Sequence, residues 1–295
     1  MKLRRTILWI LILLLPFLPS CGPSYEAILL DPDGLFVLFT DVGQADCALI
    51  VQGGHAMMVD MATSDCYDTI TGYLTLLGIT ELDALVLTHP HADHIGSAAA
   101  LLEDYSVKQI FLPDAVTTTI TFERVLDAIL QHSIPTSAPE PGEVYSLGNA
   151  LITFLSPPAG ESFSDLNDSS IAFILDYNGV AMMFTGDMGS DMEYRILESG
   201  YNIQCDLIKV PHHGSRTASS EAFVQAVSPR YAIFTTEANS SDGLPDEEVV
   251  ARYQAAGAEL YFLQYDGRSQ WLHTFRLPFY LGSYQLDGTK DGMVS

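Results

Sequence analysis

The sequence predicts an α+β protein in which two sheets pack against each other and helices cover the outside. Short apolar runs typical of strands occur in two groups along the chain, with segments of helical apolar spacing between them. This order suits a sheet-on-sheet core with outer helices. Hydrophobic residues make up 48% of the 295 residues, which allows a sizeable core and argues against a disordered chain.

The first group of strands and helices is predicted up to residue 131. A glycine pair, Gly53-Gly54, separates two apolar runs and predicts a hairpin, and Gly78 ends the first helical pattern. The predicted elements are strand 35–39, strands 47–51 and 56–59, helix 67–77, strand 84–87, helix 95–102, strand 109–112 and helix 121–131.

The second group follows with the same mixture of elements. Asn178-Gly179 between two apolar runs is a strong two-residue hairpin signal, and residues 157–169 form a polar loop. The predicted elements are strand 151–155, strands 171–177 and 180–184, helix 192–198, strand 207–210, helix 220–227, strand 231–235, helix 245–256, strand 259–263 and a last strand near 271–277. We expect one domain over 35–285 and a loose tail over 286–295.

The N-terminus has the features of a targeting segment. Basic residues at the start precede an apolar run over 7–15, and Cys21 follows a small residue. The pattern predicts a lipoprotein-type signal peptide over 1–20, lipid on Cys21, and a tether over 21–34. An ordinary secretion signal and an uncleaved anchor are the alternatives, and each places the domain outside the cytoplasmic membrane.

Charge and cysteine content narrow the possible functions. The formal net charge of −24 argues against a broad nucleic-acid footprint, which needs a basic surface. It does not exclude a small anionic substrate held by metal ions, whose local charge dominates a site. Cys47 and Cys66 are a candidate pair in an oxidising compartment, but with Cys205 they are expected to be small buried hydrophobic residues.

One short stretch, Thr88–His94, carries the strongest chemical signal. It follows an apolar run and places three imidazoles and one carboxylate within six residues. Imidazole nitrogen and carboxylate oxygen are ordinary ligands of zinc and its neighbours, and a buried group of this kind needs such a partner. The spacing lets His89 and His91 face one ion while Asp93 and His94 face a second.

Two further stretches also place ligand-type residues directly after predicted strands. Thr185-Gly186-Asp187 follows the strand that ends at Phe184, and Pro211-His212-His213-Gly214-Ser215 follows the strand that ends at Val210. Ligands at strand ends are held by a rigid scaffold, as a metal site requires.

These motifs resemble the metallo-β-lactamase superfamily, and more narrowly the nuclease-type domain of ComEC competence proteins and their stand-alone relatives. The resemblance covers roughly residues 35–273. The motifs that carry it are Asp41–Asp46, Val59-Asp60, Thr88–Gly96, Asn167–Ser170, Thr185–Asp187 and Lys209–Ser215, with Asn239, Pro245 and Gly257 continuing it.

The resemblance implies a four-layer αββα sandwich with a two-metal hydrolytic site at one edge. It assigns His89 and His91 to the first metal, and Asp93 and His94 to the second. It makes Asp187 the bridge between the two metals.

The same resemblance assigns one further ligand and several supporting residues. His212 completes the second site, with His213 as the alternative for that role. Asp60 braces the site near the reacting water without being a ligand, and Gln44 and Asp46 shape the rim.

The chain departs from the family pattern at two places. Many members carry another histidine between the first motif and the bridging aspartate, but here only His132 lies in that interval, on the predicted helix 121–131 or just past it, where we expect a surface residue. The loop with Asn167 and Asp168 occupies the place of the missing ligand, so the first site is expected to be loose, to favour manganese or magnesium, or to fill only with substrate. Leu244 stands where ComEC relatives often have histidine before Pro245.

The predicted function is dinuclear, metal-dependent hydrolysis of a phosphodiester. Asp93 would orient or accept the proton of the attacking water, while Ser215 and Arg216 would contact an anionic group. The resemblance favours DNA as substrate, whereas the acidic chain and Leu244 favour a small external ester, such as a teichoic-acid phosphorylcholine ester. The alternative is a non-catalytic binding lipoprotein linked to DNA uptake or to the cell envelope.

Overall fold

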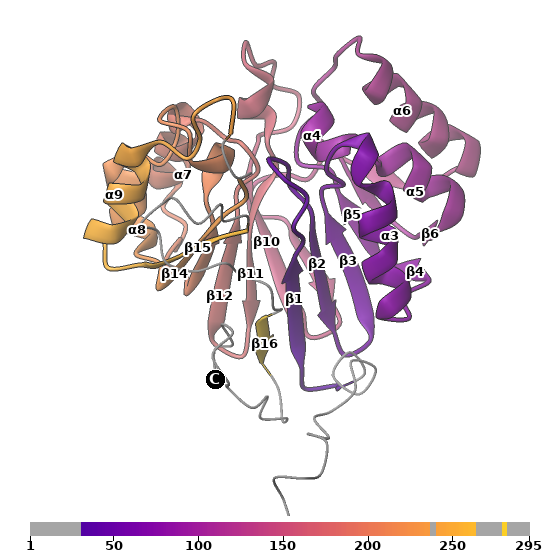
Figure 1. Cartoon of the computed structure of the whole chain (residues 1–295), viewed down its shortest axis with the longest axis horizontal. Coiled ribbons are helices and arrows are strands. Elements are labelled where there is room, and N and C mark those ends of the chain that lie inside the picture. The colour runs from indigo at the N-terminus through magenta and orange to yellow at the C-terminus, as the bar shows by residue number, and fades with distance from the viewer. Residues whose placement is uncertain (1–30, 237–239, 264–278, 282–295) are drawn as a thin grey trace, which may run out of the picture.

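The computed structural model describes residues 31–236, 240–263 and 279–281, which form two packed sheets between outer helices (Figure 1). The first sheet and a small pair beside it contain β1 (Leu35–Phe39), β2 (Ala48–Gln52), β3 (His55–Val59), β4 (Glu81–Leu82), β5 (Ala84–Val86), β6 (Ser106–Val107), β7 (Ile110–Phe111), β8 (Thr136–Ser137) and β16 (Phe279–Leu281). The second sheet contains β9 (Val144–Leu147), β10 (Ala150–Ser156), β11 (Ala172–Tyr177), β12 (Val180–Phe184), β13 (Leu207–Lys209), β14 (Tyr231–Phe234) and β15 (Glu259–Phe262).

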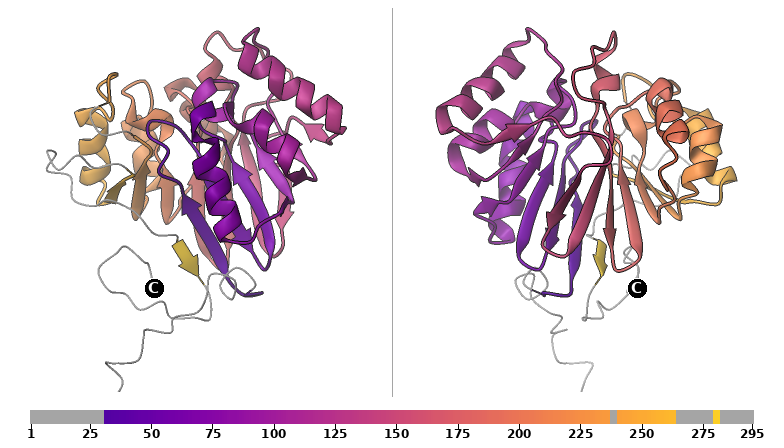
Figure 2. Two further views of the ribbon diagram at one scale, coloured as in Figure 1. Left: turned by 45° about the vertical axis from the view of Figure 1, so that its right-hand side comes forward. Right: turned by 180° about the vertical axis from the view of Figure 1, so that it is seen from behind.

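The helices form the two outer layers (Figure 2). The first layer consists of α3 (Tyr67–Leu76), α4 (Ala92–Ile95), α5 (Ala98–Asp104) and α6 (Ile120–His132). The second consists of α7 (Ser190–Ser199), α8 (Glu221–Val227) and α9 (Glu247–Ala255). Three short 3₁₀ turns, η2 (Ser64–Cys66), η3 (Leu166–Ser169) and η4 (Pro211–Gly214), lie in the connections.

The strand order brings the two halves of the chain together as a sandwich. The first sheet runs β16-β1-β2-β3-β5-β7-β8, and the second runs β15-β14-β13-β12-β11-β10-β9. Apolar side chains from the facing surfaces form the central core, among them Ile50, Met57, Phe154 and Phe173. Separate apolar clusters lie under the two helix layers. The predicted αββα sandwich is therefore confirmed.

Parallel pairing decides where the site residues meet. β3 pairs in parallel with β5, while β12, β13 and β14 form a parallel run in the second sheet. The carboxyl ends of parallel neighbours lie at one edge of a sheet. The segments that follow β3, β5, β12 and β13 therefore emerge together, at the end where α4 lies and opposite the β2–β3 turn (Figure 1).

Most predicted elements are confirmed to within a residue or two at their ends. β1 has the predicted bounds, and the Asn178-Gly179 turn joins β11 to β12 with Asn178 at φ 51°. The predicted helix over 220–227 starts one residue later, because Ser220 is its N-cap and accepts a hydrogen bond from Phe223 N.

One predicted helix is wrong, because the structure has two helices in its place. The segment predicted as a single helix over 95–102 is divided into α4 and α5 at Gly96-Ser97. A Cβ on Gly96 would lie 2.6 Å from Ser64 N and 2.7 Å from Ala62 O, so the chain passes there against the 62–64 loop. Asp93 and His94 thereby lie on a short helix of their own.

Several strands have no counterpart in the prediction. β9 pairs with β10 through a turn at Gly148-Asn149, the short β4 and β6 pair with each other, and β8 forms one edge of the first sheet. The strand predicted near 271–277 lies outside the described residues. β16 comes just after it and pairs antiparallel with β1, Leu35 opposite Leu281.

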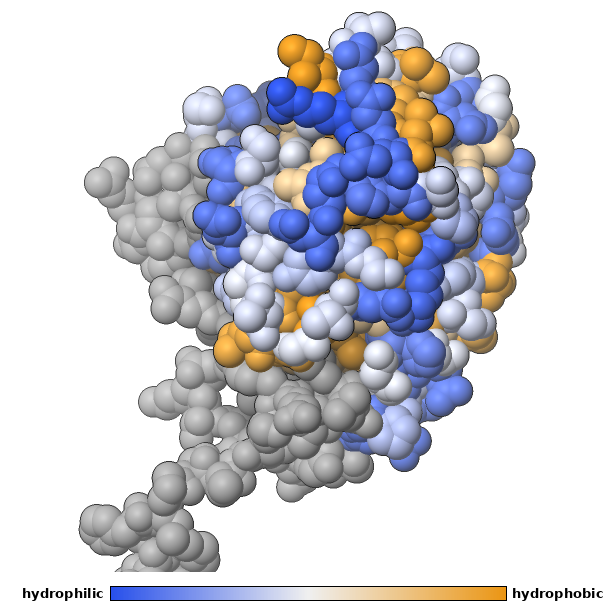
Figure 3. Space-filling model, turned by 90° about the vertical axis from the view of Figure 1, so that its right-hand side faces the viewer, coloured by the Kyte–Doolittle hydropathy of each residue, from blue (hydrophilic) through white to orange (hydrophobic). Residues whose placement is uncertain are grey.

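The outer face over α3, α5 and α6 mixes hydrophilic and hydrophobic areas (Figure 3). Leu76 on α3 and Ile120 and Leu130 on α6 are exposed hydrophobic residues. Cys47, Cys66 and Cys205 are free thiols in the structure; Cys47 and Cys205 are buried as expected, whereas Cys66 is partly exposed. Within the described ranges, every helix is too short or too polar to cross a lipid bilayer.

Candidate metal centre

His94 is buried and oriented from both sides of its ring. Nδ1 lies 2.8 Å from Asp60 Oδ2, and Nε2 lies 3.2 Å from Asp187 Oδ2. Burial lowers the pKa of His94, but the carboxylates of Asp187 and Asp60 outweigh burial and raise that pKa well above its usual value. Because Nδ1 donates to Asp60, Nε2 is the nitrogen that can bind a metal.

Asp60 acts as a rigid brace under this histidine. It follows β3 with φ 59°, and its carboxylate accepts hydrogen bonds from Thr88 N and Thr88 Oγ1, both at 2.7 Å. Burial raises the pKa of Asp60, although His94 and Thr88 N oppose the rise. Asp60 thus faces the back of His94 and not the open side of the cluster.

His213 is held in the same way from the second sheet. It follows β13 on η4, and its Nδ1 donates to the carbonyl oxygen of Thr235 at 2.7 Å. Nε2 then faces Asp187 Oδ2 at 3.3 Å and Asp93 Oδ2 at 3.5 Å. Burial lowers the pKa of His213, but the carboxylates of Asp187 and Asp93 raise it to about 9.

Four side chains therefore converge at one point. Ligand atoms of Asp93, His94, Asp187 and His213 all lie within 4.8 Å of one another. Nε2 of His94 and Nε2 of His213 are buried and have no hydrogen-bond partner among the described residues. Two such imidazole nitrogens beside two carboxylates make a donor set that fits a divalent metal ion of the zinc type.

His89 and His91 lie beside this cluster. His89 Nε2 and His91 Nδ1 are 3.0 Å apart, and the ring centroids of His89 and His94 are 4.1 Å apart. Burial, followed by the neighbouring His94, holds the pKa of His89 well below its usual value. The two imidazoles predicted to hold the first ion thus lie against each other, next to the four-residue cluster but not within it.

The chain matches the family described as the metallo-beta-lactamase superfamily over residues 40–235. The chain belongs to this superfamily. Its metal-type residues lie at the strand ends of the shared sandwich, which is the scaffold that the match covers.

Other comparisons agree with this metallo-beta-lactamase fold. ComE operon protein 3 of Bacillus subtilis is 30% identical over 205 residues, covering 70% of this chain and 26% of that protein. Competence protein ComA of Neisseria gonorrhoeae is 26% identical over 268 residues, covering 89% of this chain and 35% of that protein. The chain thus spans about a quarter to a third of these relatives' length.

Solved structures show the same fold at low identity. YhfI of Bacillus subtilis, a metallo-beta-lactamase fold protein, aligns with a TM-score of 0.53 at 14% identity, over 78% of this chain and 96% of that one. The CmlA β-hydroxylase E377D mutant aligns with a TM-score of 0.54 at 14% identity, over 85% of this chain and 54% of that one.

The structure separates the two adjacent histidines that the sequence left open. His213, the predicted alternative, lies in the metallo-beta-lactamase cluster, whereas the preferred His212 points its Nδ1 at Thr217 Oγ1, 3.1 Å away. The reason is the carbonyl of Thr235, just after β14, which fixes the ring of His213. We therefore assign the ligand role to His213.

Four other predicted residues lie outside the cluster of Asp93, His94, Asp187 and His213. Asp168 Oδ1 accepts a hydrogen bond from Gly189 N at 3.1 Å, at the start of α7. The side-chain oxygen of Asn167 is buried with no partner among the described residues. Ser215 Oγ contacts Thr217, and Arg216, 78% exposed, pairs with Asp246 at 2.8 Å.

Two charged residues matter more than the sequence indicated. Asp46, predicted to shape the rim, is only 6% exposed and forms an ion pair with Lys209, which is 3% exposed. Lys209 Nζ also lies 3.3 Å from Asp187 Oδ1. One feature of the sequence could have indicated this role for Lys209. It is a lysine at the end of an apolar strand, in a chain with only 13 Lys and Arg residues.

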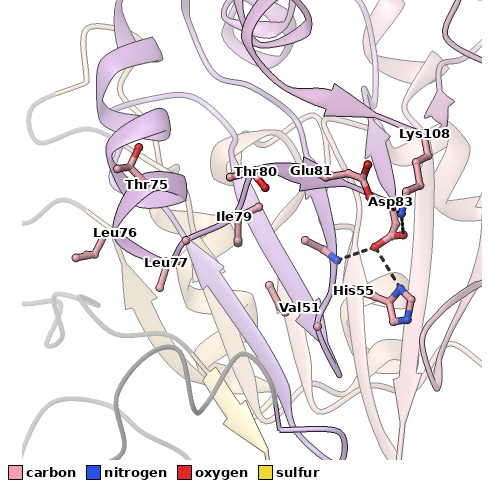
Figure 4. Close-up of a pocket in the computed structure, with 13 residues that line it drawn as sticks. Val51, His55, Thr75, Leu76, Leu77, Ile79, Thr80, Glu81, Asp83 and Lys108 are labelled. Carbon is pink, nitrogen blue, oxygen red and sulfur yellow. Dashed lines mark hydrogen bonds and ion pairs between the residues drawn. The ribbon is translucent and has the colours of Figure 1, made fainter.

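A separate cavity of about 560 Å³ lies at the start of β3 (Figure 4). His55 and Ala56 line it at the start of that strand, whereas Asp60 follows its end. Asp83 in this cavity already pairs with His55 at 3.3 Å and with Lys108 at 2.9 Å. The metal-type chemistry is therefore concentrated at the other end of the sheet.

Proposed function

We propose that this chain is a metal-dependent hydrolase whose principal ion is held by Asp93, His94, Asp187 and His213. The observation that carries the proposal is the pair of buried Nε2 atoms of His94 and His213, which have no hydrogen-bond partner in the part of the chain that the structure describes and which lie within 4.8 Å of two carboxylates. His89 and His91 would hold a second ion together with Asp187. Zinc suits the mixed nitrogen and oxygen donors, and manganese is the second choice for the ion beside His89 and His91.

When bound, divalent ions in such a site lower the pKa of water and stabilise negative charge that develops on a substrate oxygen. The residues of the chain supply the positions for this chemistry. Asp60 and the Thr235 carbonyl fix the rings of His94 and His213. Asp93, whose side chain is 33% exposed, is the acidic member of the cluster that faces solvent, so it is the group placed to accept a proton there.

A phosphodiester is the proposed substrate class. Relatives named for competence support DNA as one member of this class. The net charge of −24 favours a small ester over a long polyanion, because a nucleic acid would be repelled by most of the surface. Arg216, the predicted anion contact, is already paired with Asp246. We therefore propose a small external phosphodiester ahead of DNA.

Attachment to the membrane through lipid on Cys21 remains part of the proposal. Its support is the basic start, apolar run and cysteine of residues 1–21, which lie outside the described residues. The test is metabolic labelling with a fatty acid. Label on the wild-type chain and none on Cys21→Ser is expected, and label on both would contradict it.

Activity is tested on the purified full chain in detergent. Metal content is measured first, and hydrolysis of bis-p-nitrophenyl phosphate and of linear DNA is then compared with added zinc or manganese. We expect turnover of the small ester, lost in His213→Ala and Asp187→Ala. The matched control His132→Ala alters a surface histidine paired with Glu103 and should retain it.

Two results would contradict the hydrolase proposal. The first is full metal loading without turnover of either substrate, which would favour the alternative of a non-catalytic binding protein. The second is turnover that survives both ligand substitutions. Turnover of DNA alone would retain the hydrolase and reverse the order of its substrates.

A further inference from the structure

Lys209 is a buried cation next to the candidate metal site. It ends β13, which lies between β14 and β12 in the second sheet, and is 3% exposed. A buried ammonium group needs compensating partners, because removal from water strongly disfavours its charge. The partners of Lys209 therefore indicate why this residue is at this position.

The three partners of Lys209 match its three N–H donors. Nζ forms an ion pair with Asp46, donates to the carbonyl oxygen of Gly186 at 2.9 Å, and lies 3.3 Å from Asp187 Oδ1. Two of these partners, Gly186 and Asp187, belong to the loop that carries the central carboxylate of the metal site. Lys209 thus connects a core strand directly to that carboxylate.

The two oxygens of Asp187 face different partners. Oδ2 points to Nε2 of His94 at 3.2 Å and to Nε2 of His213 at 3.3 Å, whereas Oδ1 points to Lys209. An ammonium group on one oxygen restrains rotation of the carboxylate. Asp187 therefore presents a single oxygen to the point where the two histidines converge.

The backbone of Asp187 is restrained as well. Its N–H donates to Ser170 Oγ at 3.0 Å. Gly186, at φ 49°, has so little room that a Cβ would lie 2.9 Å from side-chain atoms of Ser170 and Thr88. These contacts restrain the main chain at Asp187. The contact with Lys209 restrains the carboxylate of the side chain.

Asp46 holds Lys209 and balances its charge. Asp46 N donates to the carbonyl oxygen of Asp93 at 3.1 Å, so Asp46 is anchored to the first metal motif. Its carboxylate lies between Lys209 and the Nδ1 of His213, 3.6 Å away. An unbalanced cation would repel a divalent ion nearby, and the Asp46–Lys209 pair removes that repulsion.

We propose that Lys209, anchored by Asp46, is a positioning residue that fixes Asp187 to offer one oxygen to the metal ion. The inference rests on the proposed metal site but not on any particular substrate. It differs from a purely structural buried ion pair, which would stabilise the fold and leave metal coordination unchanged.

The test uses Lys209→Met combined with Asp46→Asn in the full chain. This double substitution removes one positive and one negative charge together, so the net charge of the site is retained. Zinc affinity is measured by competition with a chelator, and coordination by the visible absorbance of the cobalt-substituted protein. Unfolding of the metal-free protein is followed in parallel, and Lys108→Met serves as the matched surface-lysine control.

We expect about 10- to 100-fold weaker zinc binding and an altered cobalt spectrum in the double variant, the range typical for loss of an outer partner of a metal ligand. Unchanged affinity with an unchanged spectrum would overturn the inference and leave Lys209 a structural residue. If the double variant does not fold, the cobalt spectrum of Asp46→Asn decides: a wild-type spectrum overturns the inference, and an altered one supports it. Wild-type protein that binds no metal would instead refute the proposed function itself.

Discussion

His213 is held in the candidate metal site by contacts at both ring nitrogens. Its Nδ1 donates to the Thr235 carbonyl, and its Nε2 faces two carboxylates without a hydrogen-bond partner among the described residues. His212 has a similar left-handed backbone, φ 50°, but its ring contacts Thr217. The orientation of each ring, rather than its place in the chain, decides which histidine can bind an ion.

We predict that His213→Ala lowers zinc affinity by more than about 100-fold, because it removes a ligand and not only an outer partner. His212→Ala is expected to change zinc affinity by less than about tenfold. Competition with a chromogenic chelator measures both values. The assignment fails if His212→Ala loses the ion while His213→Ala retains it.

At the scale of elements, Gly96 separates α4 from α5 and lets α4 lie close to the 62–64 loop. Gly96→Ala would place a methyl group 2.6 Å from Ser64 N and 2.7 Å from Ala62 O. We expect a loss of about 1–3 kcal/mol in the free energy of unfolding, typical of overpacking. Urea unfolding in a chelator measures it without the contribution of metal binding.

The matched control is Gly72→Ala within α3, where a Cβ meets nothing within 4 Å. Alanine is the better helix former, so this variant should gain up to about 1 kcal/mol. Equal effects of the two substitutions would show that the close approach at Gly96 does not restrict α4.

Glu193 joins two helices of the outer layer. It lies on α7, and its carboxylate accepts hydrogen bonds from Ser219 N and from Ser220 N, the latter at 2.8 Å, just before α8. Burial raises the pKa of Glu193 above the ordinary 4.5, and the hydrogen bonds only partly oppose this rise. The folded protein therefore binds the proton more tightly than the unfolded chain does.

The sign of the pH dependence follows from this raised pKa. The contribution of Glu193 to stability is fully present below pH 4.5 and is lost as pH rises through the folded pKa. We predict that the stability of wild type relative to Glu193→Gln decreases from pH 4.5 upward. Urea unfolding of metal-free protein across this range tests it. A difference that is constant, or that grows with pH, would contradict the prediction.

At the scale of the whole molecule, the sequence predicts much of the architecture because local patterns determine it. Apolar runs, Asn178-Gly179 and Ser220 mark strands, a turn and a helix start through short-range interactions. Pairing of β16 with β1 joins residues more than 240 positions apart, and no local pattern reports it. The break at Gly96 likewise depends on a loop that only the fold brings near.

The candidate site shows the same division between local and tertiary information. The motif at 88–94 and the residues after β12 and β13 are visible in the sequence because they follow apolar strands. The choice of His213 depends on Thr235, which directly follows the neighbouring strand β14. The importance of Lys209 and Asp46 depends on burial and on a contact across the two sheets, which composition and spacing do not specify.

The two halves of the molecule each supply half of the four-residue cluster, so a bound ion should stabilise the sandwich as a whole. Asp93 and His94 follow the first sheet's β5, whereas Asp187 and His213 follow β12 and β13 of the second. At a zinc concentration 1,000 times the dissociation constant, binding to the folded state alone adds about 4 kcal/mol to stability. We predict that a chelator lowers the midpoint of thermal unfolding reversibly, and that added zinc restores it in wild type but much less in His213→Ala. The prediction fails if protein shown to contain metal unfolds at the same midpoint with and without the chelator. Metal binding would then not stabilise the packing of the two sheets.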